Sequence, residues 1–206
     1  MKLYHGTNCS SALNICYNGI DLSKSQRYLD FGVGFYTTPS YDHAAITAIR
    51  KTDKYNHLKR TNETPYIVEI TCNFNVDRDN IRIKQFPMHS DEWAEFVINN
   101  RLYDEILEKY HLENSNRDKK YDIIYGEIAD GSVLNIAYKI NNGLLLPSDV
   151  KTVDLLKNGN PYGYQYSFHT ERAKACITSM KCDIIHNIEE YKIRIDKSRK
   201  RRWGYE

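Results

Sequence analysis

Apolar residues recur along this chain at spacings that switch between the period of a strand and that of a helix. The clearest strand is 66–72, an apolar and β-branched run that directly follows Pro65. The clearest helix is 41–54, in which three alanines and an isoleucine recur at helical spacing. Thr38 is the expected N-cap of this helix, with Pro39 at its first position. Together the two segments predict a core shared by strands and helices.

Shorter segments of both kinds follow the same rule. Ser90 and Thr170 are the expected caps of two further helices, while the charged stretch 52–64 is expected to form a surface loop. The remaining predicted strands are 2–4, 81–83, 121–125, 163–169 and one within 181–195. The remaining predicted helices are 8–17, 91–110 with a break near Arg101, 133–138, 150–156 and 171–177. Because strands and helices are interspersed without repeats or a polar linker, we expect one α+β domain.

Length and composition narrow the class of protein. A chain of 206 residues suits one domain with its own core, and contents of 41% hydrophobic and 27% charged residues are typical of a soluble protein. The net charge of +2 neither favours nor excludes a nucleic-acid partner. Five cysteines without framework spacing predict reduced thiols. Because no apolar run reaches roughly 18 residues and no export signal is seen, we expect a cytoplasmic protein without a membrane contact.

Residues 192–202 are strongly basic, with seven lysines and arginines against Asp196 alone. A solvated, frayed terminus is the simpler interpretation, since disorder concentrates at chain ends. The functional alternative is a contact with a phosphate backbone or an acidic partner. We therefore divide the chain into a domain over residues 1–190 and a basic C-terminal tail over residues 191–206.

Two short stretches near the amino end carry residues suited to ligand binding. His5 and Gly6 end a predicted strand, which leaves backbone groups open beside an imidazole. A glycine-loosened turn at 31–34 then leads into a short strand that carries Tyr36. An imidazole, a bare glycine backbone and an aromatic ring can together clamp a flat heteroaromatic ligand. The bland alternatives are a structural histidine and a core tyrosine, and the residues alone leave both open.

Spacing excludes several other chemistries. Gly32-x-Gly34 lacks the third glycine and the preceding strand of a dinucleotide-binding fingerprint. No Gly-x-Ser-x-Gly elbow and no phosphate-binding loop occur. The seven histidines are scattered and no Cys-x-x-Cys is present, so no metal is expected.

The order of several motifs resembles a known superfamily. His5-Gly6-Thr7, an Ile-x-x-x-Gly-Ile run at 15–20, Phe31-Gly32-x-Gly34-Phe35-Tyr36 and Ala44-Ala45 look like the amino-terminal half of a poly(ADP-ribose) polymerase catalytic domain. Over about residues 2–180 the chain resembles more closely the bacterial domain-of-unknown-function 3990 family, which is placed in the ADP-ribosyltransferase superfamily. Further matching segments are 93–101, 121–130 and 165–173.

This resemblance implies NAD as the ligand and a role for each motif. It places His5 against a ribose hydroxyl, the backbone of Gly6 against the nicotinamide carboxamide, and the ring of Tyr36 on nicotinamide. Thr7 and Gly34 belong to the same implied NAD-binding set. The implied catalytic residues are His5, Tyr36 and Gln165.

Gln165 is a departure from the polymerase pattern, which has a glutamate at this position. An amide can orient a ribose but offers no negative charge to a cationic transition state. We therefore expect transfer of a single ADP-ribose unit instead of chain elongation. Ala44 and Thr47 likewise replace a serine and a second tyrosine. Glu127 and Asp130 form either a solvated turn or an acidic group that faces the ligand.

The resemblance thus predicts a single α+β ADP-ribosyltransferase-like domain with a split, mostly antiparallel two-sheet core and flanking helices. Its implied activity is NAD-dependent mono-ADP-ribosylation of a macromolecular acceptor, either protein or nucleic acid. Bacterial relatives of this kind imply a toxin or defence role with a neutralising, antitoxin-type protein partner. The alternatives are an NAD glycohydrolase and a catalytically silent module that binds NAD or another protein.

Overall fold

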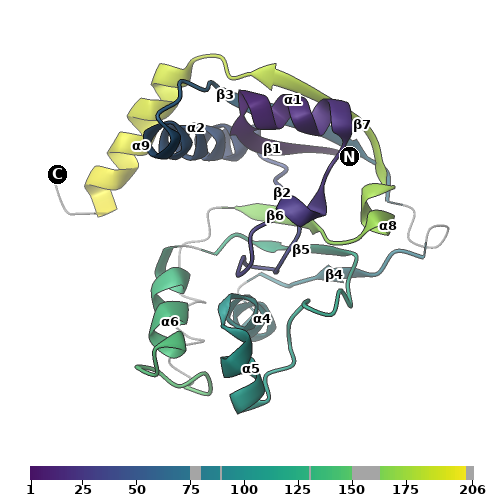
Figure 1. Ribbon diagram of the computed structural model, residues 1–206, viewed down its shortest axis with the longest axis vertical. Helices are drawn as coiled ribbons and strands as arrows, with labels where there is room; N and C mark the ends of the chain where they lie inside the picture. Colours follow the sequence, from purple (N-terminus) through teal and green to yellow (C-terminus); the bar gives the residue numbers. More distant parts are fainter. Residues whose placement is uncertain (75–79, 89, 130, 150–162, 203–206) are drawn as a thin grey trace. The chain divides into compact units, whose positions relative to one another are not determined.

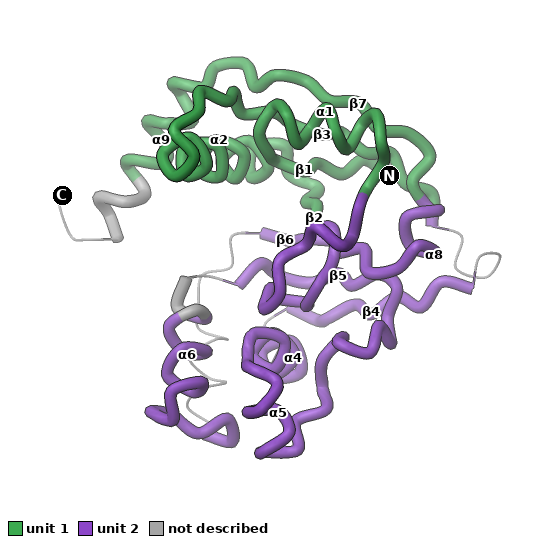
Figure 2. Tube along the Cα trace, in the orientation of Figure 1, with its two compact units in different colours: residues 1–20, 37–73, 177–206 green, residues 21–36, 74–176 purple. Residues whose placement is uncertain are grey.

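The computed structural model describes residues 1–74, 80–88, 90–129, 131–149 and 163–202 of the chain (Figure 1). Contacts divide these residues into two compact units, each assembled from segments far apart in the sequence (Figure 2). Unit 1 contains residues 1–20, 37–73 and 177–206, and unit 2 contains residues 21–36 and 74–176. None of the described helices combines the length and the apolar character required to cross a bilayer.

Unit 1 is built on a three-stranded antiparallel sheet. Its strands are β1 (Lys2–Asn8), β3 (Pro65–Cys72) and β7 (Ile177–Ile184), with β3 in the centre. The apolar run predicted at 66–72 is this central strand, and its apolar residues Ile67, Val68 and Ile70 are buried, as expected for a strand that is covered on both faces. The register places Gly6 of β1 opposite Ile67 of β3.

Two helices of unit 1 start at side-chain caps. α1 (Cys9–Asn18) begins behind Asn8, whose side chain accepts a hydrogen bond from the Ser11 amide at 3.0 Å. α2 (Tyr41–Lys59) begins behind Ser40, so the prediction of Thr38 as its cap was wrong. The reason is that the Thr38 carbonyl accepts a hydrogen bond from the Tyr4 amide of β1, so it is not available for the first hydrogen bond of the helix, which the Ser40 carbonyl accepts from Ala44.

α2 also extends five residues beyond its predicted end at 54, into a stretch expected to be a loop. Most of the polar residues there are exposed, as on the outer face of any surface helix. The helix ends where Arg60 adopts the left-handed conformation, with φ of 54°, and donates its amide hydrogen to the Asn56 carbonyl. The Asn56 side chain then binds the backbone of Glu63 and holds the return of the chain.

The carboxyl end of the described chain is a helix, α9 (Ile188–Arg202), and not the frayed terminus expected from its charge. Ile195 is only 5% exposed and packs in a cluster with apolar residues of α2 and β3. Tyr191 and Arg194 both bind the Asp42 carboxylate of α2, at 2.8 and 3.0 Å. The strand predicted within 181–195 is confined to β7, which ends at Ile184.

Ile195→Ala is expected to lower the free energy of unfolding by roughly 2–4 kcal/mol, because it removes buried methyl and methylene groups from this cluster. The matched control is Ile193→Ala, since Ile193 lies two residues earlier in the same helix and is 54% exposed. We expect that control to change the free energy by less than about 0.5 kcal/mol in urea unfolding. Equal effects of the two substitutions would mean that α9 does not dock on α2.

Unit 2 contains the second sheet, in the order β2-β6-β5-β4, except for the last residue of β2, Thr37, which belongs to unit 1. The strands are β2 (Phe35–Thr37), β4 (Ile83–Gln85), β5 (Ile123–Glu127) and β6 (Tyr164–Phe168). β5 and β6 are antiparallel, whereas β4 and β5 are parallel. The two sheets are thus mostly antiparallel, and the predicted α+β class with a split two-sheet core is confirmed.

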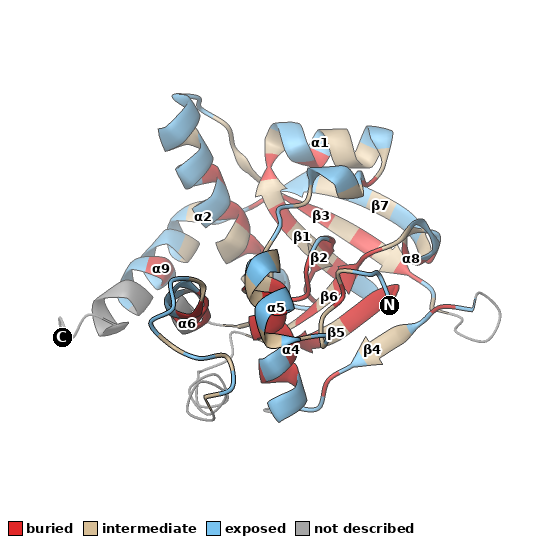
Figure 3. Ribbon diagram, turned by 60° about the horizontal axis from the view of Figure 1, so that its bottom comes forward, coloured by how far each residue is buried: buried red, intermediate tan, exposed pale blue. Residues whose placement is uncertain are grey.

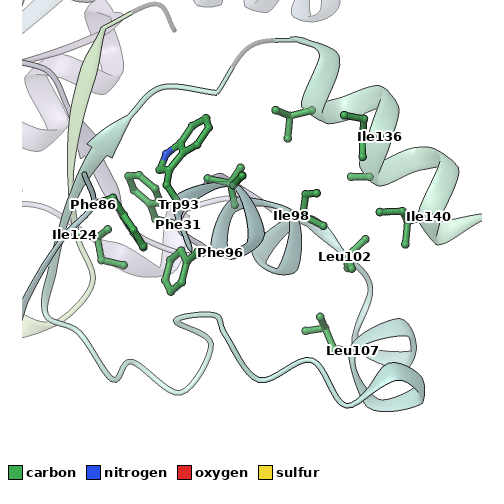
Figure 4. Packing of buried hydrophobic residues seen from close by; sticks show 14 residues of the cluster. Phe31, Phe86, Trp93, Phe96, Ile98, Leu102, Leu107, Ile124, Ile136 and Ile140 are labelled. Carbon is green, nitrogen blue, oxygen red and sulfur yellow. The ribbon is translucent and has the colours of Figure 1, made fainter. Parts of the chain in front are cut away.

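Three helices of unit 2 contribute residues to its main apolar core, α4 (Asp91–Arg101), α5 (Asp104–Tyr110) and α6 (Gly131–Asn141). Unit 2 also contains the short helix α8 (Glu171–Lys174) and the 3-10 turn η1 (Leu22–Lys24). Figure 4 shows Phe31, Phe86 and Phe96 gathered around one face of α4, with Ile136 and Ile140 of α6 turned toward it. Most residues of α4 are buried, and its exposed residues lie near its start, at 91, 92 and 95 (Figure 3).

Several predictions for unit 2 hold, and others need correction. Ser90 and Thr170 cap α4 and α8, and the helix break near Arg101 is present. α8, however, stops at Lys174 and does not reach residue 177, because Ile177 already pairs with Cys72 as the first residue of β7. The helix expected at 150–156 lies outside the described residues.

Candidate functional site

Tyr36 lies on the edge strand β2, and its side chain binds the loop that precedes this strand. Its hydroxyl group donates a hydrogen bond to the carbonyl of Gly32 at 2.6 Å and accepts one from the amide of Phe31 at 3.0 Å. The ring also stacks on that of Phe31, with 6.4 Å between their centroids. Burial first, and then the nearby Asp30 carboxylate, raise the pKa of Tyr36 well above its ordinary value. The hydroxyl therefore stays protonated and keeps donating to the loop.

His169 and Ser25 hold the same loop from two other directions. The His169 Nδ1 atom lies 2.8 Å from the Val33 carbonyl oxygen, and its Nε2 atom lies 2.7 Å from Ser167 Oγ. A carbonyl oxygen only accepts, so Nδ1 carries the proton and Nε2 accepts from the serine hydroxyl. Ser25 Oγ accepts from the Gly34 amide at 2.9 Å and donates to the Gly34 carbonyl at 2.8 Å. The loop with Gly32 and Gly34 is therefore fixed by side chains at several points.

Burial lowers the pKa of His169 to about 4, against a smaller opposing effect of the Val33 carbonyl. The folded pKa is below that of the unfolded chain, so the neutral imidazole stabilises the fold fully above about pH 6.5. This stabilisation, roughly 3 kcal/mol, is expected to be lost as the pH falls from about 6.5 to 4. The variant for the test is His169→Asn, whose amide can still donate to Val33.

The measurement is urea unfolding of the wild type and of His169→Asn across this pH range. We expect the stability difference between the two proteins to shrink with falling pH. The control is His57→Asn, which makes the same substitution at a histidine that is exposed on α2. A stability difference that stays constant from pH 7 to 4 would show that His169 does not titrate as a buried neutral group.

Gln165 lies on β6 beside a buried ion pair. The Arg101 Nε atom is 2.9 Å from Oδ1 of Asp30, and the two side chains are 14% and 7% exposed. Oδ2 of Asp30 accepts from Gln165 Nε2 at 2.8 Å and from the Ala129 amide at 3.2 Å. Gln165 Nε2 also lies 3.4 Å from the Glu127 carbonyl. Tyr36 lies on β2, which is the neighbour of β6 in the sheet. The fold of unit 2 therefore brings Tyr36 and Gln165 to one polar cluster around Asp30.

The predicted residues of unit 1 lie on β1. His5 and Thr7 are partly buried and occupy alternate positions, so they point to the same face of the sheet. Gly6 points to the opposite face, where α2 packs. A Cβ atom on Gly6 would lie 2.8 Å from Ala48 N and still closer to the Ala44 carbonyl oxygen. The close approach of α2 therefore requires a glycine here, which is a reason that the sequence analysis did not foresee.

The predicted site residues are thus distributed over the two units. His5, Gly6 and Thr7 lie together in unit 1, and Gly34, Tyr36 and Gln165 lie together in unit 2. Glu127 is 2% exposed, so the alternative of a solvated turn is wrong for this residue, while Asp130 lies outside the described residues.

Sequence reasoning missed Asp30, Arg101 and His169. Asp30 is only 5% exposed and accepts hydrogen bonds from two distant side chains. No local pattern in the sequence marks Asp30, because its two side-chain partners lie 71 and 135 residues away along the chain. Among the described residues, no group of three or more histidine, cysteine, aspartate or glutamate side chains is placed to hold a metal ion.

Comparison with family models places the chain in one family. Residues 1–178 match the family described as a protein of unknown function, DUF3990, and the chain belongs to that family. Searches of curated proteins and of solved structures gave no match.

Proposed function

We propose that this protein is an NAD-dependent mono-ADP-ribosyltransferase, a member of the superfamily whose motif order its sequence resembles. In the proposed reaction the bond between nicotinamide and the ribose C1′ atom breaks, and nicotinamide leaves as a neutral base. A nucleophilic atom of a macromolecular acceptor forms the new bond to C1′ and loses a proton.

The observation that carries the proposal is the meeting of two separate motifs in unit 2. Tyr36 belongs to the glycine-rich motif and Gln165 to a motif far along the chain, yet both lie beside Asp30. Their strands, β2 and β6, are neighbours in one sheet. An aromatic ring and an oriented amide are suited to a nicotinamide and to the hydroxyl groups of its ribose, respectively.

Four of the motif residues then have a proposed role. Tyr36 offers its ring to nicotinamide, and its hydroxyl keeps the glycine loop in place. Gln165 accepts a hydrogen bond from a ribose hydroxyl. In unit 1, the imidazole of His5 is proposed to bind a ribose hydroxyl, and the backbone of Gly6 to pair with the carboxamide.

The test is incubation of the purified protein with NAD labelled in the adenosine part. Release of nicotinamide together with label on protein or nucleic acid supports the transferase. Release together with free ADP-ribose identifies a glycohydrolase instead. Intact NAD after incubation with a broad set of acceptors, including a cell lysate, would contradict both activities.

Two substitutions of Tyr36 separate its ring from its hydroxyl. If the ring stacks on nicotinamide, Tyr36→Leu should weaken NAD binding in calorimetry by about 5- to 150-fold, the equivalent of roughly 1–3 kcal/mol. Tyr36→Phe retains the ring and should retain most of the affinity. The matched control is Tyr17→Leu, since Tyr17 is 83% exposed on α1. Equal NAD affinity of all variants would remove Tyr36 from the site.

A further inference from the structure

The strongest unexplained feature of unit 2 is a buried carboxylate whose oxygens are each bound by side chains from other elements. Asp30 lies in the segment before β2, Arg101 at the end of α4, and Gln165 on β6. The sequence separations from Asp30 are 71 and 135 residues, so only the fold assembles this group. Burying a charge is costly unless it is paired and hydrogen-bonded, which Asp30 is.

The surroundings of Gln165 fix the orientation of its amide. Its near neighbours on one side are the Asp30 carboxylate at 2.8 Å and the Glu127 carbonyl at 3.4 Å, and both groups only accept hydrogen bonds. The amide nitrogen must therefore face them, which turns Oε1 the other way. Oε1 accepts no hydrogen bond from any described residue, although Gln165 is only 7% exposed.

The charge of Arg101 strengthens the hydrogen bond that Gln165 donates to Asp30. Because Arg101 neutralises Asp30 through Oδ1, Oδ2 can remain an ionised acceptor in a buried place. A hydrogen bond from Gln165 to an ionised acceptor is stronger than one between neutral groups. It also draws electron density toward Oε1, since hydrogen bonds in a chain polarise one another.

We propose that Asp30 is a positioning residue, which holds Gln165 so that Oε1 is presented as a hydrogen-bond acceptor to a hydroxyl group of a ribosyl ligand. This inference rests on the proposed function for the identity of the ligand. The polarised Oε1 atom takes the place of a carboxylate oxygen next to the sugar that becomes cationic as nicotinamide leaves. Asp30 itself need not touch the ligand, because it acts through Gln165.

The test exchanges the acid and the amide between the two positions. Gln165→Glu alone places two carboxylates at hydrogen-bond distance and removes the donor that Asp30 binds. We expect it to lower kcat for nicotinamide release by about 10- to 100-fold and to reduce thermal stability. Asp30→Asn/Gln165→Glu restores one acid and one amide, because the asparagine introduced at position 30 can accept from Arg101 and donate to the new carboxylate. The double variant should recover the stability and at least the wild-type kcat, with KM within about threefold.

Asp30→Asn alone tests whether Asp30 affects kcat, which should stay unchanged if Asp30 contributes only to stability. An asparagine can turn its own amide toward Gln165, which allows Gln165 to rotate and present its nitrogen in place of Oε1. We expect kcat to fall by about tenfold or more while KM changes little, since the loss concerns the developing cation. The control is Asp104→Asn, a half-exposed acid of the same unit that should leave kcat unchanged.

The outcomes separate this inference from the proposed function. A wild type without any NAD turnover would overturn both the proposed function and the ribosyl ligand. In that case the recovery of stability in Asp30→Asn/Gln165→Glu would still decide whether Asp30 positions Gln165. An active wild type with a fully active and stable Gln165→Glu variant would overturn the positioning role alone. So would a double variant that is no better than Gln165→Glu.

Discussion

Gly6→Ala is expected to prevent unit 1 from folding, or to cost more than about 4 kcal/mol of its free energy of unfolding. The added methyl group would meet the backbone of α2 at Ala44 and Ala48, inside van der Waals contact. Backbone atoms in the middle of a helix cannot rotate aside as a flexible side chain can, so β1 and α2 would have to separate. The measurement is urea or thermal unfolding followed by circular dichroism.

The matched comparison is Gly126→Ala on β5 of unit 2. There the new methyl group would lie 3.0 Å from the Phe31 ring and 3.2 Å from Trp93, which are side chains that can shift by a few tenths of an ångström. We expect this overpacking to cost only about 1–3 kcal/mol. A Gly6→Ala protein as stable as Gly126→Ala would show that α2 can move away from β1.

Gly6 also illustrates how one residue can satisfy two constraints. The family resemblance explains the glycine by the approach of a ligand, whereas the structure explains it by the approach of a helix. These explanations concern different parts of the residue, since the missing Cβ faces α2 whereas the backbone N–H and C=O groups lie in the plane of the sheet, perpendicular to the strand. A loss of NAD binding in a Gly6 variant is therefore informative only if the variant is folded.

Local signals in the sequence predicted local structure well. The strand prediction at 66–72 rests on β-propensity. The cap predictions at Ser90 and Thr170 each rest on one side-chain hydrogen bond to the first turn of the helix. Both signals depend only on residues that are close in the sequence. α9 was missed because its charge obscured a helical spacing. Ile188, Tyr191 and Ile195 fall three and four residues apart and form the docked face.

The candidate site was predictable only where it consists of motifs. Tyr36 and Gln165 were found through the family resemblance, and the fold of unit 2 brings them to one cluster. Asp30 could not be assigned from the sequence, because its partners come from α4 and β6 and no local pattern identifies them. A buried ion pair is a property of tertiary packing, and a single sequence carries no record of which distant charges meet.

Removal of Arg101 is the second substitution with a large expected effect. Arg101→Met leaves the Asp30 carboxylate buried beside two neutral donors, and breaking a buried pair in this way typically costs about 3–5 kcal/mol. The control is Arg27→Met. Arg27 pairs with Asp104 at 3.6 Å in the same unit, but the two side chains are 71% and 48% exposed, so we expect a loss below about 1 kcal/mol.

A second variant shows whether the cost comes from the stranded charge or from lost packing. Asp30→Asn/Arg101→Met removes both charges, and the neutral asparagine introduced at position 30 can still bind Gln165 and the Ala129 amide. If the stranded carboxylate dominates, the double variant should recover at least half of the stability that Arg101→Met loses in urea unfolding. If the double variant is less stable than Arg101→Met, the two residues contribute independently to stability. The ion pair as a whole is then not what holds Gln165. Recovery of stability without recovery of kcat would instead agree with the positioning role, because the introduced asparagine no longer forces the Gln165 amide into one orientation.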